Sequence, residues 1–124
     1  MRTSVVTYTG NGSDSRAITG VGFQPTVVII KGATTQHTAM RLSSMSGDAS
    51  ILLSDTGVLI ADVIQSLDAD GFTLGTHASV NSDTIVYYAL CLGDPASDND
   101  LAVGSYTGNS TDDRNLVISP AFQP

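Results

Sequence analysis

The sequence contains no glutamate, no tryptophan, one lysine and one cysteine among its 124 residues. Its five cationic side chains are scattered, and twelve aspartates give a formal net charge of −7. We therefore expect no nucleic-acid partner, because a phosphate backbone binds to a surface rich in Lys and Arg. The single cysteine, Cys91, excludes an intramolecular disulfide. It lies in the apolar run VYYALCL, where we expect a buried thiol that acts as a small hydrophobic side chain.

Long apolar segments are missing as well. No run approaches the ~20 residues that a membrane-spanning helix needs. Met1 and Arg2 lead directly into a Thr-rich alternating segment and not into the apolar region of a signal peptide. We expect no membrane partner, and a protein that is made in the cytoplasm without a signal peptide.

The residues that are abundant favour strands and turns. Val, Ile, Thr and Tyr are typical of strands, whereas Asp, Ser, Gly and Asn are typical of turns. The pattern predicts an all-β protein, an antiparallel β-sandwich or jelly-roll-like fold with about nine or ten short strands. Between residues 58 and 68 the apolar spacing also fits a short helix, but strands are favoured because Asp-Ala-Asp-Gly then forms a turn. The strands are expected at residues 3–9, 16–21, 26–31, 37–43, 51–54, 58–68, 71–76 and 84–92.

One of these segments is apolar throughout. Residues 26–31 read TVVIIK, a continuous run rich in β-branched residues with no polar alternation until Lys31. Such a run is typical of a strand that is covered on both faces.

Two stretches of the chain share their order of residues. Tyr8 to Pro25 reads YTGNGSDSRAITGVGFQP, and Tyr106 to Pro124 reads YTGNSTDDRNLVISPAFQP. Seven residues between Val5 and Arg16 recur 98 positions later, and Phe-Gln-Pro recurs one inserted residue further on. This period is the length of a whole sandwich domain and exceeds that of solenoid repeats. We predict a β-sandwich module at residues 1–93, a linker at 94–100 and a partial second repeat of two strands at 101–124.

The partial second repeat is too short to fold alone, because an isolated two-stranded hairpin is marginal in water. Three outcomes are open: its strands join a sheet of their own chain, they join the sheet edge of a neighbouring copy, or they stay unpaired. A head-to-tail contact between copies closes into a ring or continues as a filament. The apolar residues expected to mediate the pairing are Val103, Tyr106, Leu116, Val117, Ile118 and Phe122.

The repeated residues also carry a likeness to a known class of protein. The order YTGNG…R.I.GVGFQP..VIIK, then SLDADGF.LGT, then N…..YYAL resembles a recurring β-sandwich module of bacteriophage tail-fibre and other appendage proteins. The resemblance implies a non-enzymatic structural protein of the phage virion, a tail or appendage component that assembles as a homo-oligomer. A capsid head-decoration (cement) protein is the alternative within this class. The implied partners are other copies of the chain and other virion proteins, and no cofactor is implied.

A carbohydrate-binding module that recognises a host-surface glycan is a further hypothesis. It requires an exposed aromatic platform, and related modules often carry tryptophans near these strands. Because the sequence has no tryptophan, the tyrosines would have to form this platform. They are Tyr8, Tyr87, Tyr88 and Tyr106.

Metal and catalytic patterns are weak. Asp68 and Asp70 begin a calcium-loop spelling, but Phe72 and Ser79 occupy the later ligand positions, so a tight turn at Gly71 is the better interpretation. A second acidic cluster comprises Asp94, Asp98 and Asp100. We interpret it as a solvated linker, and weak calcium binding is the alternative. His37 and His77 have no metal-ligand spacing. No nucleophile elbow is present, and we expect no enzymatic activity.

The loop between the first two expected strands occurs in both copies. Its Asn and Gly residues suit left-handed backbone positions, and Asp14 is expected to pair with Arg16 or to cap the loop. A binding role for Asn11, Asp14 and Arg16 is the alternative to this structural one.

Overall fold

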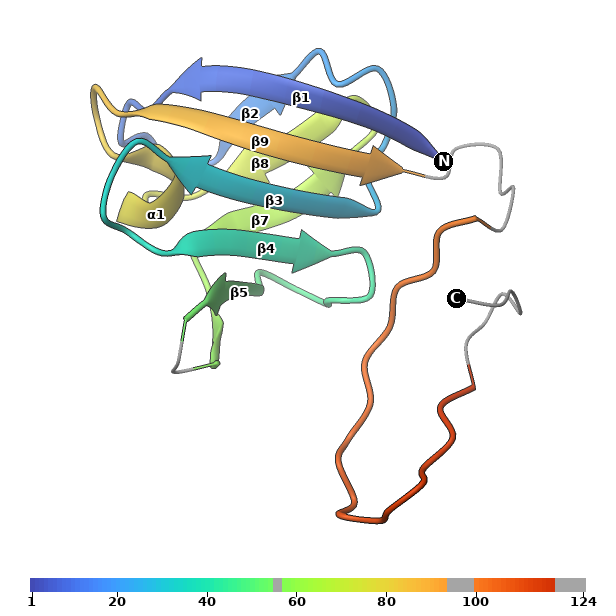
Figure 1. Cartoon of the computed structure of the whole chain (residues 1–124). Helices are drawn as coiled ribbons and strands as arrows, with labels where there is room; N and C mark the ends of the chain where they lie inside the picture. The colour runs from blue at the N-terminus through green and yellow to red at the C-terminus, as the bar shows by residue number, and fades with distance from the viewer. Residues whose placement is uncertain (55–56, 94–99, 118–124) are drawn as a thin grey trace.

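The computed structural model describes residues 1–54, 57–93 and 100–117. Two antiparallel sheets lie face to face, with one short helix at one end of them (Figure 1). The larger sheet has six strands in the order β1-β9-β3-β4-β5-β6, and the smaller has three in the order β2-β8-β7. The elements are β1 (Arg2–Thr9), β2 (Arg16–Thr19), β3 (Val27–Gly32), β4 (Thr38–Leu42), β5 (Ser50–Leu53), β6 (Leu59–Ile60), β7 (Ile64–Asp68), β8 (Gly71–Leu74), α1 (Ala78–Asn81) and β9 (Val86–Gly93).

The chain crosses between the sheets directly after its first strand. β1 pairs along its whole length with β9, so that Tyr8 lies opposite Tyr87. β2 then joins the smaller sheet, where Ile18 lies opposite Phe72 in β8. This crossing closes the sandwich along one side, because β1 and β2 belong to different sheets yet are joined by one short loop.

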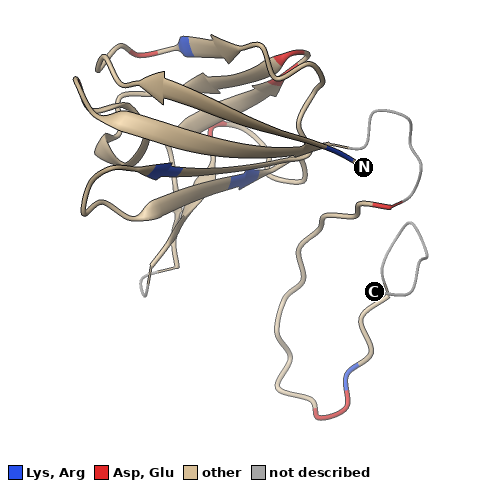
Figure 2. Cartoon of the chain, turned by 45° about the horizontal axis from the view of Figure 1, so that its top comes forward, with Lys and Arg blue, Asp and Glu red and all other residues tan. Residues whose placement is uncertain are grey.

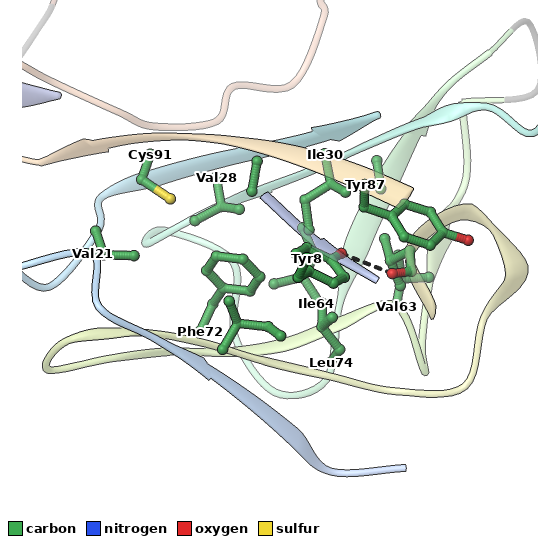
Figure 3. Close-up of a cluster of buried hydrophobic side chains, with 14 of the residues drawn as sticks. Tyr8, Val21, Val28, Ile30, Val63, Ile64, Phe72, Leu74, Tyr87 and Cys91 are labelled. Carbon is green, nitrogen blue, oxygen red and sulfur yellow. Dashed lines mark hydrogen bonds between the residues drawn. The ribbon is translucent and has the colours of Figure 1, made fainter. Parts of the chain in front are cut away.

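The core lies between the sheets and is built by strand alternation, since successive side chains point to opposite faces. Tyr8 stacks on Tyr87 with ring centroids 5.3 Å apart, and its ring meets Phe72 edge-on at 6.4 Å. Figure 3 shows these rings among aliphatic side chains from both sheets, with Cys91 at one side. The buried Tyr8 hydroxyl donates to the carbonyl of Val80 at 2.8 Å, so that no polar group is lost from the core.

The expected all-β sandwich is confirmed, and residues 58–68 form strands and not a helix. The expectation of a turn at Asp68-Ala69-Asp70-Gly71 is also confirmed, because β7 and β8 form a hairpin in which Asp68 lies opposite Gly71. The helix at residues 78–81 was not expected from the sequence. It is a single turn that begins where the His77 ring nitrogen accepts the Ser79 N–H at 3.1 Å, a local contact without a periodic apolar pattern.

In the single chain, residues 100–117 form no strand and run as an extended loop away from the two sheets (Figure 1), so the pairing of the second repeat with a neighbouring copy stays a prediction. Extended backbone without a ladder partner does not count as a strand. The expected cover on both faces of β3 is found in part: Val28 and Ile30 are fully buried on the inner face and Val27 is 7% exposed on the outer face, whereas Ile29 is half-buried and Lys31 is exposed.

Candidate functional site

The loop between β1 and β2 is held by its own side chains. The Asn11 amide oxygen accepts the Ser13 N–H at 3.0 Å, and the Asp14 carboxylate accepts the Ser15 N–H at 2.8 Å. Asp14 also accepts from the Gln65 amide at 2.9 Å. Asp14 therefore caps the loop, and within the part of the chain that the structure describes it makes no ion pair with Arg16.

Arg16 closes the start of this loop. Its guanidinium Nη1 donates to the Thr9 carbonyl at 2.7 Å, and the guanidinium carbon lies 5.4 Å from the centre of the Tyr8 ring. The cation therefore sits over an aromatic face, which attracts it electrostatically. Asn11, Asp14 and Arg16 thus all hold the loop in shape.

Asn81 fastens the loop to the rest of the module, and nothing in the sequence singled it out. Its side-chain oxygen accepts from the Asn11 N–H and from Arg16, each at 3.1 Å. Its side-chain nitrogen donates to the Ser13 carbonyl at 2.7 Å and to the Gly75 carbonyl at 2.9 Å. All four hydrogen-bonding sites of this buried amide are used. Asn81 therefore connects the loop, the end of the helix and the segment that directly follows β8.

The second copy of the loop, at residues 106–114, has the same internal contacts as the first. Arg114 donates to the Thr107 carbonyl, and its guanidinium carbon lies 5.6 Å from the centre of the Tyr106 ring. The Asn109 amide oxygen accepts the Thr111 N–H at 3.1 Å, and the Asp112 carboxylate accepts the next N–H at 3.0 Å. Each contact repeats one of the first loop with a shift of 98 residues.

The backbone follows the same path in both loops. Ser15 and Asp113 each have φ of +52°, and Gly12 and Ser110 have φ of +68° and +58°. Non-glycine residues rarely adopt this region, where Asn and Asp are enriched and Ser is not. The local sequence is therefore enough to form the loop without the surrounding sandwich.

What the second loop lacks is a partner. Tyr8 is nearly buried at 9% exposure, whereas Tyr106 is 70% exposed. Leu116 and Val117 are also exposed, at 42% and 89%. Among residues 100–117 no contact takes the place of those that Asn81 makes with the first loop. Of the residues predicted to mediate pairing, Tyr106, Leu116 and Val117 are thus exposed and Val103 is half-buried, whereas Ile118 and Phe122 lie outside the described residues.

A polar hollow of about 510 Å³ lies at the edge between the two sheets and is lined in part by Arg41. The Arg41 guanidinium is buried and donates to the carbonyls of Ala49, Ile64, Met45 and Gly47. Burial lowers the pKa of Arg41, and the nearby Asp48 opposes that shift. Three of these carbonyls belong to the loop between β4 and β5 and the fourth belongs to β7, so Arg41 holds this loop against the smaller sheet.

The sequence-predicted metal candidates do not converge. Asp68 accepts from Ser66 and Thr73, whereas Asp70 accepts the backbone N–H groups of Gly20 and Gly22. In the described ranges no group of three His, Cys or acidic residues is placed to hold a metal ion. Asp94 and Asp98 lie outside those ranges, and Asp100 forms an ion pair with the amino terminus.

The tyrosines divide into two pairs. Tyr8 and Tyr87 are in the core and present no ring face to solvent. Tyr88 and Tyr106 are exposed, but Tyr88 lies on β9 and Tyr106 lies in the second loop. His37 is exposed, and His77 caps the helix. Within the described residues, none of the helices has the length and apolar character that crossing a membrane requires.

These features define a two-sheet, all-β protein whose polar side chains brace its loops. The chain belongs to the DUF7483 family, a domain of unknown function, which matches residues 2–100. Comparison with the curated proteins finds no significant match, and the same holds for the solved structures. The family match ends just before Val103, where the repeated residues begin again.

Proposed function

We propose that this chain is a non-enzymatic structural protein of a bacteriophage virion, a tail or appendage component whose copies are joined through residues 101–117. The observation that carries the assembly part of this proposal is the second loop. It repeats the hydrogen bonds of the first loop, yet its apolar side chains have no core to enter. The phage context is supported by the resemblance of the repeated segments to virion modules.

A sheet edge is the natural acceptor for such a segment, because an added strand gains main-chain hydrogen bonds along its whole length. β1 is an edge strand of the larger sheet and is eight residues long without proline. We call residues 101–117 the chain tail. Within it, Leu101 to Thr107 matches Thr3 to Thr9 of β1 in length. A neighbouring copy can therefore accept the tail as a seventh strand.

The tail is a weak substitute for β1 itself. The inward-facing Val6 of β1 corresponds to Gly104, which offers no side chain to a core and weakens a strand. Addition at the free edge of β1 in a neighbouring copy therefore fits the sequence better than exchange for β1.

Light scattering coupled to size-exclusion chromatography tests this proposal. We expect the full chain to form a species larger than a monomer, and the double variant Tyr106→Ala/Arg114→Ala to form smaller species. Gln36→Ala, an exposed change in the loop between β3 and β4 and outside residues 101–117, is the control and leaves assembly unchanged. A full chain that stays monomeric at high micromolar concentration contradicts the proposal. Electron micrographs of the assembled species then separate a fibre or ring from the cap expected of a head-decoration protein.

A further inference from the structure

The outer face of the six-stranded sheet is apolar from one edge to the other. Antiparallel sheets that face water commonly alternate between apolar inward and polar outward residues, but here most outward positions from β9 to β6 are apolar, and on β1 the outward Val5 lies between Thr3 and Thr7. The strand register places one outward residue of every strand in a single row across the sheet. The row consists of Val5, Leu90, Ile29, Met40, Ile51 and Leu59.

Three side chains of this row are exposed, and Ile29, Met40 and Ile51 are half-buried. Val5 is 67% exposed, Leu59 60% and Leu90 39%, and Tyr88 beside the row on β9 is 53% exposed. In Figure 1 no part of the described chain crosses this face, which is turned toward the viewer. The continuous apolar run of β3 is typical of a strand covered on both faces, yet its outward Ile29 is only half-buried in the single chain.

Charge distinguishes this face from the rest of the molecule. The chain carries a net charge of −7, yet the six strands of this sheet contain no aspartate (Figure 2). Arg41 points inward and Arg2 lies over the Phe23 ring, so Lys31 is the one charged side chain among the outward strand positions described. Two acidic copies repel each other least when they approach through this face.

We propose that the outer face of the six-stranded sheet is a self-association surface that packs against the same face of a second copy. Sheets pack face to face about 10 Å apart with their strands within about 30° of parallel. A face six strands wide covers roughly 500 Å² by strand spacing and rise. Two such faces bury roughly 1,000 Å², which reaches the lower limit for a specific interface.

A second copy suits this face for two reasons. The apolar row runs across every strand of the sheet, so the same face on two copies can pack together about a two-fold axis. The strands of this sheet carry no aspartate although the chain is acidic, so this is also the face through which two copies repel each other least. This inference deepens the proposed assembly function but depends on a different surface, so the two are separable by mutation.

The test places a lysine in the row. Leu90→Lys and Val5→Lys put an unpaired charge inside the interface, which is costly to bury, while they make the net charge of the chain less negative. We expect each to weaken dimerisation by tenfold or more, measured by sedimentation equilibrium of the full chain. Ala17→Lys, on the exposed side of β2 in the smaller sheet, is the matched control with the same charge and leaves dimerisation unchanged.

The outcomes are distinct. The inference is overturned if Leu90→Lys associates like wild type, or if Ala17→Lys weakens association equally. Val5 is on the edge strand with most of its side chain in solvent, so we expect Val5→Lys to fold. If Leu90→Lys fails to fold, the association of Val5→Lys alone decides the test. The variant Tyr106→Ala/Arg114→Ala keeps the sheet face intact, so we expect it to form dimers. Adding Leu90→Lys to this variant should convert the dimers to monomers. Loss of all association in the tail variant alone would assign the dimer to the tail and exclude this face.

Discussion

The amide oxygen of Asn81 accepts a hydrogen bond from Arg16 at 3.1 Å, although 65 residues separate the two in the chain. Through this contact the end of the short helix holds the loop that leads from one sheet into the other. Tyr8 lies under the same arginine and bonds to Val80, the residue before Asn81. The junction between the sheets is therefore a connected polar cluster at the margin of the core.

Replacing Asn81 tests the importance of that junction. Asn81→Ala removes four side-chain hydrogen bonds and leaves the buried Gly75 carbonyl without this donor. We expect the free energy of unfolding to fall by about 2–4 kcal/mol, because buried polar groups left unpaired are expensive. Urea denaturation measures this. The exposed Asn115→Ala is the control and should change stability by less than about 0.5 kcal/mol; an equal loss in both variants would contradict the assignment.

Tyr8 and Tyr106 form a matched pair across the repeat. Tyr8→Phe deletes a buried hydroxyl that donates to Val80, and we expect a loss of about 1–2 kcal/mol in stability. Tyr106→Phe changes an exposed ring and should leave the stability of the single chain unchanged. Thermal unfolding of both variants at low protein concentration measures the difference.

The burial of Tyr8 also predicts that the stability of the fold depends on pH in the alkaline range. Burial raises the pKa of Tyr8, Tyr87 adds to that rise and Arg16 opposes it. Because the unfolded phenol ionises near pH 10 while the folded one stays neutral, its contribution to stability is complete below about pH 10 and falls above it. Tyr8→Phe should therefore lose less stability than wild type above that pH. Equal pH profiles for the two proteins would show that Tyr8 is not protected.

The burial of Cys91 predicts a similar loss of stability, at a lower pH than that of Tyr8. Burial raises the pKa of the Cys91 thiol from 9.0 to about 11. Its contribution to stability is complete below about pH 9 and is lost as the pH rises toward 11. Between pH 8 and pH 10 we expect wild type to lose about 1–1.5 kcal/mol more than Cys91→Ala. Rapid reaction of the native thiol with a disulfide reagent at pH 8 would contradict the buried, neutral thiol.

Gly71 is required by a close approach between strands. A Cβ at this position would lie 1.9 Å from the carbonyl oxygen of Ile18 in β2. We expect Gly71→Ala to destabilise the fold by about 3 kcal/mol or more, since the contact is with backbone that cannot rotate away. Gly12→Ala is the comparison, because Gly12 has φ of +68° but open space around it, so that only backbone strain of about 1–2 kcal/mol applies. The melting temperature of Gly71→Ala should therefore be lower than that of Gly12→Ala.

The fold was predictable because its signals are local. Strand residues and turn residues alternate along the chain, and the turn before Gly71 was enough to favour strands over a helix at residues 58–68. The burial of Cys91 followed from its apolar neighbours. Strand order was not predictable in this way, since the pairing of β9 with both β1 and β3 joins segments distant in sequence.

The candidate site divides along the same line. The repeat and its loop residues are visible in the sequence, and the loop forms the same hydrogen bonds in both copies because those bonds join neighbours in the chain. Asn81 was missed, because a lone asparagine in a polar segment carries no signal until the helix end brings it to the loop.

Residues near one another in the chain specify the strand-rich architecture, the internal hydrogen bonds of the repeated loop and the apolar character of β3. The folded chain is needed to bring Asn81 to that loop and to line up six apolar side chains across one face of the larger sheet. The first depends on the packing of the helix end against segments distant in sequence, and the second on strand register, which long-range backbone pairing sets and no local preference specifies.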